Sequence, residues 1–359
     1  MPDVSEPDDL DLVQSAPRRL VLITGAGRSG TSTLSGTLNF LGLHSPRPSL
    51  GANASNPRGF FEPRWAIDFH RRILDRALVD IFDSRPDAIE RIRAVLTPEH
   101  EGEVVEWLSQ EVAHAPQVVV KDPRSTWMPR LWESAASQLD MPTSFVTMLR
   151  HPAEVIGSRS TYYAKGDERS VRQFQVTSIA RWVNANLLAE RQTRGESRAF
   201  VPYSELLENW RPVLLRLKAE LNLTYNADVA SDAHHSVDDF VDPSLRRHHV
   251  GWGDLNIPAQ LQEIAEETWH LCTQLASSHG RDATVEAGLD ELATKYGVML
   301  GDAAAIAHDV TAAEVKLARR KAVRKVRAAA QSATNDSSPA QDKARFPLRL
   351  IAGWTRSGR

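Results

Sequence analysis

The chain has 359 residues, longer than an average domain, but an α/β protein of this length often folds around one sheet. A formal charge of −3 gives no overall attraction to nucleic acid, so any anion site must come from local groups of arginine and lysine. The only cysteine, Cys272, excludes an internal disulfide framework and a multi-cysteine metal site. We therefore expect a globular protein of a reducing compartment, the cytoplasm, with no nucleic-acid partner. The sequence leaves its oligomeric state open.

The first residues differ in composition from the rest of the chain. Residues 1–17 are rich in Asp, Pro and Ser, a composition that buries too little apolar surface to order a chain. They are acidic where a secretory signal would be basic and then apolar, and no run in the sequence approaches the ~18 apolar residues of a membrane span. We expect a flexible acidic leader, followed from residue 18 by an ordered domain that does not span a membrane.

Short apolar runs alternate with helical patterns up to residue 222. The run 20–23 is continuous, as expected of a strand buried on both faces, and a glycine-rich segment follows it. A helix with Leu34, Leu38 and Leu41 on one face comes next and stops near Gly42. This alternation predicts an α/β fold of the P-loop type, a parallel sheet with helices on both faces. Further strands are expected at 118–120, 144–149 and 198–203, and helices at 101–114, 152–165, 171–194 and 204–222.

The C-terminal part is expected to be helical and, toward its end, basic. Helical patterns at 257–278 and 283–296 complete a main domain over residues 18–300. A basic helix is expected at 312–330, with Val315, Ala322 and Val326 on one side, and a linker and tail at 331–359. Such a helix is typical of peripheral contact with an anionic membrane, although a solvated helix explains the pattern equally well.

The segment Gly25–Ser32, with the sequence GAGRSGTS, links the first strand to the first helix. In that context successive backbone N–H groups and the helix N-terminus can hold an anion. A nucleoside-triphosphate P-loop carries lysine after its last glycine, but Thr31 stands at that position here. The positive charge lies within the loop, at Arg28, whose planar guanidinium can bind a phosphate or sulfate oxygen bidentately without a metal. The loop therefore predicts an anion site.

A second motif lies at the end of the strand 144–149, where Leu149-Arg150-His151-Pro152 is followed by Ser158. Together with the loop, this motif resembles the sulfotransferases that use 3'-phosphoadenosine-5'-phosphosulfate (PAPS), in particular their bacterial branch. The resemblance implies that Arg150 and Ser158 hold the 3'-phosphate of PAPS, and that PAPS is the co-substrate with no metal. It also implies that the 5'-phosphosulfate is held by Arg28, Ser29, Gly30, Thr31 and Ser32.

The resemblance extends less sharply over residues 19 to about 250. The segment Asn56–Glu62 resembles the part of the family that carries a carboxylate into the active site, and Tyr203 with Glu205 resembles a strand-end tyrosine near the adenine. Lys121–Arg124 follows the central strand at its ligand-facing end. In relatives a late basic segment closes over the nucleotide, and it would correspond here to Arg246 and Arg247.

Sulfuryl transfer to an alcohol needs a group that takes the hydroxyl proton and a group that stabilises charge on the leaving phosphate. Arg28 and the loop amides suit the second role, and Glu62 is the first candidate for the base. Cytosolic animal relatives commonly use a histidine at the end of the central strand, but this sequence has Lys121-Asp122-Pro123 there, so that assignment fails. Asp122 and, with less support, His151 stay open as alternatives.

The acceptor is the least defined part of the prediction. A hydroxyl of a carbohydrate, a glycolipid or another small or lipid-linked molecule fits the chemistry, and the loops expected to choose among them lie at 44–60, 75–100 and 225–255. Trp65 and Trp127 lie near the motifs, where they suit an acceptor pocket and a core equally well.

Two other functions stay open at this point. A P-loop kinase acting on a small molecule is disfavoured because the loop lysine is missing and because the pair Arg150 and Ser158 has no role in ATP handling. A non-catalytic protein that binds PAP (3',5'-adenosine bisphosphate) or another nucleotide is disfavoured because Glu62 is present beside an intact Arg28.

Overall fold

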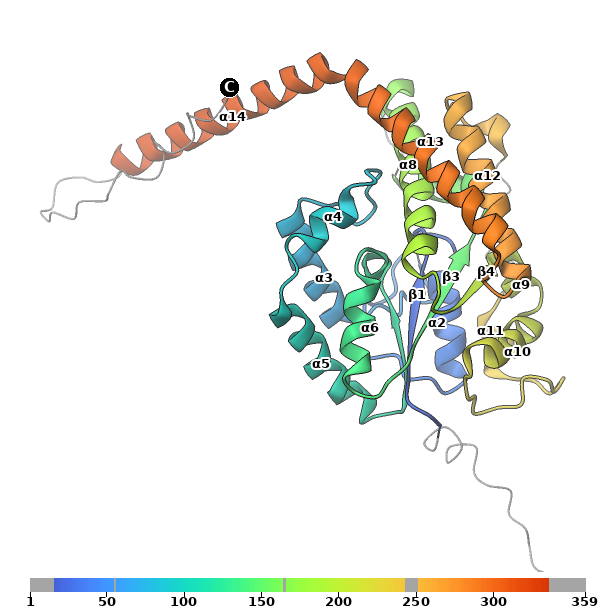
Figure 1. Ribbon diagram of the computed structural model, residues 1–359. Coiled ribbons are helices and arrows are strands. Elements are labelled where there is room, and N and C mark those ends of the chain that lie inside the picture. The colour runs from blue at the N-terminus through green and yellow to red at the C-terminus, as the bar shows by residue number, and fades with distance from the viewer. Residues whose placement is uncertain (1–15, 55, 164–165, 243–250, 336–359) are drawn as a thin grey trace, which may run out of the picture. The chain divides into compact units, whose positions relative to one another are not determined.

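The computed structural model describes residues 16–54, 56–163, 166–242 and 251–335 (Figure 1). The chain divides into two units, Met1–Leu300 and Gly301–Arg359. The leader expected at residues 1–17 lies almost entirely outside the described residues, and so does the tail beyond residue 335.

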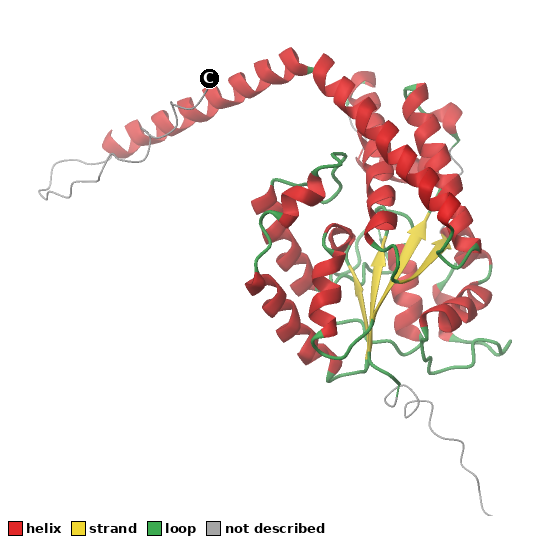
Figure 2. Cartoon of the chain, in the orientation of Figure 1, coloured by secondary structure: helices red, strands yellow, loops and turns green. Residues whose placement is uncertain are grey.

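In the described part of the first unit, the sheet has four parallel strands in the order β2-β1-β3-β4 (Figure 2). Val21 in β1 pairs with Val119 in β2 and with Ser144 in β3, so β1 lies between those two strands. Because the strands are parallel, their carboxyl ends lie at one edge, where open α/β sheets bind ligands. The predicted parallel α/β fold is confirmed. The strands are β1 (Arg19–Thr24), β2 (Gln117–Lys121), β3 (Thr143–Leu149) and β4 (Ser197–Pro202).

Helices cover both faces of the sheet, as the continuous apolar strands predict. Leu20 and Leu22 of β1 pack in one buried cluster, whereas Val21 and Ile23 pack in another on the opposite face. The first cluster takes in α3 (Arg64–Ala77), α4 (Ala88–Arg93), α5 (Pro98–Val112) and α6 (Pro129–Ser137). The second takes in α2 (Thr31–Phe40), α9 (Tyr203–Glu208), α10 (Trp210–Leu221) and α11 (Ser236–Phe240).

A third apolar cluster packs near the end of β3 and against β4, around Leu149 and Phe200. It also contains buried side chains of four helices. These helices are α7 (Pro152–Tyr163), α8 (Glu168–Gln192), α12 (Ala259–Ser277) and α13 (Ala283–Ile306). Two short 3-10 helices also belong to this unit, η1 (Pro123–Trp127) and η3 (Trp252–Asp254).

The single helix expected over residues 204–222 is wrong, because the structure has α9 and α10 there. Asn209 separates them: its backbone is extended, and its side chain accepts a hydrogen bond from the Arg211 amide. This is the behaviour of an N-cap residue, which stops one helix and starts the next. Tyr203, expected at the end of the fourth strand, is instead the first residue of α9.

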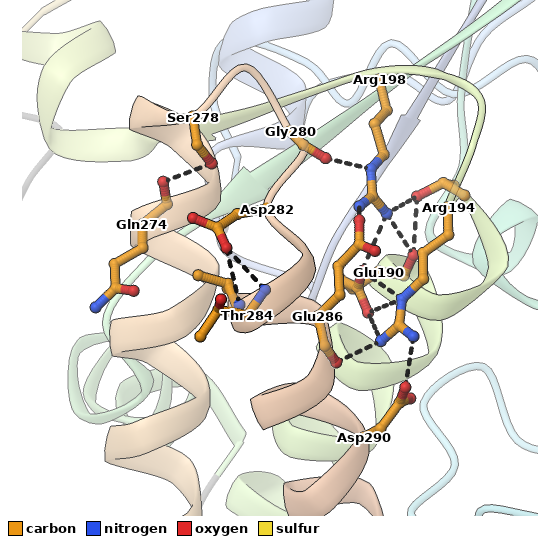
Figure 3. A network of polar contacts seen from close by, with 12 residues as sticks. Glu190, Arg194, Arg198, Gln274, Ser278, Gly280, Asp282, Thr284, Glu286 and Asp290 are labelled. Atoms are coloured by element: carbon orange, nitrogen blue, oxygen red, sulfur yellow. Dashed lines mark hydrogen bonds and ion pairs between the residues drawn. The ribbon is translucent and has the colours of Figure 1, made fainter.

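A buried network of charges joins α8, β4 and α13 (Figure 3). The carboxylate of Glu190 is fully buried and pairs with Arg194 at 2.7 Å and with Arg198 at 3.1 Å. Arg198 also pairs with Glu286 at 2.7 Å, and Arg194 pairs with Asp290 at 2.6 Å. The network therefore ties the start of α13 to the end of α8.

The second unit contains the end of α13 and α14 (His308–Asn335). The basic helix predicted at 312–330 is helical throughout and extends beyond both expected ends. Its apolar side chains are exposed, with Val315 at 61% and Val326 at 67% of their full accessible surface. Among the described residues, no helix is both long and apolar enough to cross a membrane.

Candidate functional site

A pocket of about 360 Å³ is lined by residues that end or follow the parallel strands. The glycine-rich loop after β1 forms one part of it, and Lys121 at the end of β2 and Arg150 just after β3 form others. The segment 56–62 without Phe61, the pair Ile81 and Phe82, and Phe240 supply further parts of the wall. Further lining residues include Pro123, Ser158, Arg159 and Tyr203. The pocket therefore lies where an open α/β sheet is expected to bind its ligand.

The backbone of the glycine-rich loop adopts left-handed conformations and packs closely against neighbouring residues, which requires glycine at two positions. Gly25 has a φ of 118°, and a Cβ atom there would lie 2.6 Å from the carbonyl oxygen of Met148. Gly30 has a φ of 90° and a Cβ atom there would clash with the ring of Tyr203. Arg28, at a φ of 74°, is left-handed as well. The chain then enters α2 at Thr31, so the unpaired N–H groups of the first helical turn lie at the pocket.

Arg28, Arg150 and Ser158 meet in this pocket although they come from two motifs more than a hundred residues apart. Nε of Arg28 donates a hydrogen bond to Oγ of Ser158 at 3.2 Å, and Nη1 of Arg150 donates to the backbone oxygen of Arg28 at 3.2 Å. Arg150 is 6% exposed, and its Nη2 is buried with no hydrogen-bond partner among the described residues. A buried guanidinium with an unsatisfied N–H group is suited to an anionic ligand.

The other predicted nucleotide contacts divide into three groups. Gly30, Thr31, Ser32 and Tyr203 line the pocket, and the guanidinium of Arg150 lies 5.1 Å from the centre of the Tyr203 ring. Ser29 is not among the lining residues; its side chain is buried, and its Oγ has no hydrogen-bond partner in the described part of the chain. Arg246 and Arg247 lie outside the described residues.

Glu62 lines the pocket and forms a buried ion pair, which the sequence did not predict. Its Oε1 lies 2.5 Å from Nζ of Lys121, and both side chains are at least nine-tenths buried. Burying both charges costs desolvation free energy, and the attraction between Glu62 and Lys121 at this short distance acts against that cost. Lys121 therefore fixes the candidate base at the wall of the pocket.

Asp122 lies between two pocket residues, but its own side chain points away from them. It is fully buried, accepts a hydrogen bond from Nδ1 of His70 at 2.8 Å and pairs with Arg124 at 2.7 Å. Nε2 of His70 accepts from the indole N–H of Trp132, while Nδ1 faces Asp122. Burial alone raises the pKa of Asp122, but the hydrogen bond from His70 and the charge of Arg124 outweigh it and lower the pKa to about 2. These contacts give Asp122 a structural role and argue against it as the base.

His151, the third candidate base, is also displaced from the pocket. Its ring lies 5.6 Å from that of Trp252 and 5.7 Å from that of Trp269, and its Nε2 lies 3.1 Å from a carboxylate oxygen of Glu266. It is not among the residues that line the pocket.

Trp127 is a core residue, Trp65 is partly buried and packs against the same core cluster, and neither lines the pocket. The ring of Trp65 stacks on Trp107 with centroids 4.6 Å apart. Trp127 is 2% exposed, and its indole N–H donates to the backbone oxygen of Ile81. The aromatic lining comes instead from Phe60, Phe82 and Phe240, and the additional cations from Arg58 and Arg159. None of these five was named as a site residue from the sequence, but all except Arg159 lie in the loops at 44–60, 75–100 and 225–255 that were expected to choose the acceptor. Arg159 directly follows Ser158.

Among the described residues, no group of three or more His, Cys, Asp or Glu side chains is arranged to hold a metal ion. The polar groups that converge in the pocket are guanidinium, ammonium, hydroxyl and backbone N–H groups, with Glu62 as the carboxylate on its wall. This donor set matches an anionic ligand.

Comparison with known proteins gives a remote likeness of fold. No family model matches the chain, and no curated protein matches it in sequence. The sulfotransferase domain of the Synechococcus PCC 7002 olefin synthase is 17% identical, with 74% of this chain and 96% of that chain covered and a TM-score of 0.38. The sulfotransferase domain from the curacin biosynthetic pathway is 18% identical, with 73% and 99% covered and a TM-score of 0.37. A sulfotransferase from Mycobacterium tuberculosis H37Rv is 15% identical, with 73% and 78% covered and a TM-score of 0.35.

Proposed function

We propose that this chain is a sulfotransferase that moves a sulfuryl group from PAPS to a hydroxyl of a small or lipid-linked acceptor. The observation that carries the proposal is the meeting of Arg28, Arg150 and Ser158 in one pocket at the carboxyl edge of the sheet. A ligand with two separate anionic groups is the kind that such a double site suits. PAPS supplies an activated sulfuryl group on its 5'-phosphate and carries a second phosphate at the 3' position.

In this proposal the two motifs divide the anionic groups between them. The loop N–H groups, Arg28, Thr31 and Ser32 bind the 5'-phosphosulfate, because the loop and the N-terminus of α2, which has no side-chain cap in the described part of the chain, lie at the pocket. Arg150, with its buried unpartnered Nη2, and Ser158 bind the 3'-phosphate. Tyr203, beneath the Arg150 guanidinium, is proposed to border the nucleotide. Ser29, Arg246 and Arg247 stay sequence-based proposals for the same ligand.

The proposed chemistry needs one carboxylate and the loop cations. Glu62 takes the proton of the acceptor hydroxyl as the oxygen attacks sulfur, and Arg28 with the loop N–H groups stabilises the charge that develops on the leaving phosphate. Glu62 suits this role better than Asp122 or His151 because it alone of the three lines the pocket. The non-catalytic alternative is disfavoured for the same reason.

Nucleotide titration of the purified protein tests the proposal against the kinase alternative. We expect PAP to bind tightly and ATP or ADP to bind weakly, because the 3'-phosphate is the group that Arg150 and Ser158 are proposed to hold. Arg150→Ala should weaken PAP about 10- to 100-fold by calorimetry, since it removes charged hydrogen bonds from a buried site.

Ser158→Ala is expected to weaken PAP in the same direction but less, and Arg91→Ala should leave it unchanged. Arg91 is the matched control because it is an exposed arginine paired with Asp87 on α4. Equal affinity for PAP and ATP, or unchanged PAP affinity in Arg150→Ala, would contradict the 3'-phosphate site and favour the kinase function instead.

A further inference from the structure

Apolar side chains form part of the pocket wall beyond the anion-binding loop. Phe60, Ile81, Phe82, Pro123 and Phe240 all line it. The ring of Phe82 lies directly against the loop, since a Cβ atom placed on Gly27 would clash with it. This apolar wall therefore begins at the loop proposed to hold the transferred group.

The same wall adjoins the candidate base. Nζ of Lys121 lies 6.0 Å from the centre of the Phe60 ring, and the same ammonium group holds the carboxylate of Glu62. Trp127 fixes the neighbouring backbone by donating its indole N–H to the oxygen of Ile81. An acceptor hydroxyl near Glu62 would thus have its carbon skeleton against Phe60, Ile81 and Phe82.

Most polar side chains on this side of the pocket form contacts within the protein, and the guanidinium of Arg159 lies 5.0 Å from the centre of the Phe82 ring. Nδ2 of Asn56 donates to Oγ of Ser32 at 3.2 Å, and Nη1 of Arg58 donates to the backbone oxygens of Asp239 and Phe240. Glu62 and Lys121 pair with each other. A sugar ring carries a hydroxyl on most of its carbons, and burying each one without a partner costs free energy.

Resting on the function proposed above, we propose that the acceptor is an apolar alcohol or phenol, one hydroxyl on an aliphatic or aromatic body, rather than a carbohydrate. The hydroxyl meets Glu62, and the body fills the apolar wall. Burial of apolar surface supplies the affinity, and the absence of further polar groups on the acceptor avoids unpaired donors.

Binding to the protein saturated with PAP tests this inference apart from turnover. The probes are 2-naphthol and 1-octanol on one side and glucose and trehalose on the other, measured by calorimetry. We expect the apolar probes to bind at least 100-fold more tightly than the sugars. Phe60→Ala should weaken 2-naphthol about tenfold and leave PAP affinity unchanged, because the Phe60 ring lies beside Lys121, which is not among the proposed phosphate-binding residues. Phe82→Ala should weaken 2-naphthol to a similar degree. PAP affinity is measured in this variant as well, since the Phe82 ring lies against Gly27 of the loop.

Three results would overturn the inference: tighter or equal binding of a sugar, no binding of any probe, or no effect of either phenylalanine variant. In each case PAP binding that still depends on Arg150 would leave the sulfotransferase proposal standing. Loss of PAP binding in the wild-type protein would instead remove the proposed function itself.

A different observation, on α14, carries a second inference. Residues 315–335 contain no Asp or Glu, and all the described side chains of α14 are exposed. At 100° per residue, Val315, Ala322 and Val326 share one side of the helix, and Lys316, Arg320 and Arg324 lie on the other. The positive charge of the helix favours an anionic partner. Its apolar side can insert into a membrane surface, whereas the phosphate backbone of a nucleic acid would interact only with the cationic side chains, so a membrane is the favoured partner.

We also propose that α14 binds an anionic membrane surface with its Val315 side inserted at the interface. The full chain is sedimented with neutral phosphatidylcholine vesicles and with vesicles containing a quarter phosphatidylserine. We expect binding to the anionic vesicles alone, and a loss of fivefold or more in the double variant Val315→Asp, Val326→Asp. Equal binding to both vesicle types, no binding, or unchanged binding of the variant would overturn the proposal; so would a preference for duplex DNA that the variant retains.

Discussion

Replacing Glu190 with glutamine is expected to lower the free energy of unfolding by about 3–5 kcal/mol, the usual cost of removing one partner from a buried ion pair. Glu190 is fully buried, and its carboxylate is the shared partner of Arg194 and Arg198. The side chain of Arg198 is 2% exposed, so water cannot replace the lost charge. In this variant Glu286 would remain as the only charged partner of Arg198 among the described residues.

The measurement is the shift of the urea midpoint, and the same network offers its own control. Asp290→Asn removes the other carboxylate that pairs with Arg194, but this side chain is 46% exposed. Because exposed ion pairs contribute little, we expect a loss below about 1 kcal/mol in this variant. Similar losses in both variants would mean that burial of Glu190 does not set the strength of the network.

Much of the fold could be predicted because the strands are buried on both faces. A buried parallel strand has to be a continuous apolar run, and the runs at 20–23, 118–120 and 144–149 all proved to be strands. The break between helices at Asn209 was harder to predict from the sequence, since apolar residues continue at helical spacing across it. Helix α3 is absent from the predicted elements although Phe69, Ile73 and Ala77 recur at that spacing.

The site could be predicted where its residues belong to motifs that directly follow strands. Arg28 follows β1 and Arg150 follows β3, and these strands are neighbours in the sheet, so the two motifs meet at one edge. The sequence contains no information of this kind for residues 56–62, which have no regular structure beyond isolated bridges. The ion pair between Glu62 and Lys121 therefore appears only in the structure.

Which aromatic residues lie in the core and which line the pocket also depends on contacts that form only in the folded chain. Trp65 and Trp127 lie close to motif residues in sequence, but their rings point into the cluster around Trp107 and Trp132 or beneath Ile81. Phe82 has no motif nearby, yet its ring touches the loop that carries Arg28. Sequence distance to a motif is thus a poor guide to which aromatic side chains meet a ligand.

Glu62→Gln is expected to lower kcat by about 100- to 10,000-fold, the usual contribution of a general base, while PAP affinity stays nearly unchanged. Glutamine keeps the size of the side chain and can still accept a hydrogen bond from Lys121, so the pocket wall is preserved. It cannot take a proton from the acceptor hydroxyl. The comparison is made by steady-state kinetics with an acceptor that the wild-type protein sulfates, beside calorimetry with PAP.

Glu111→Gln is the matched control, because Glu111 is also a buried glutamate, with a carboxylate oxygen 2.7 Å from Nε2 of His44, but does not line the pocket. We expect this variant to keep wild-type kcat. Full activity in Glu62→Gln would mean that the ion pair with Lys121 only shapes the pocket and that the proton leaves by another route.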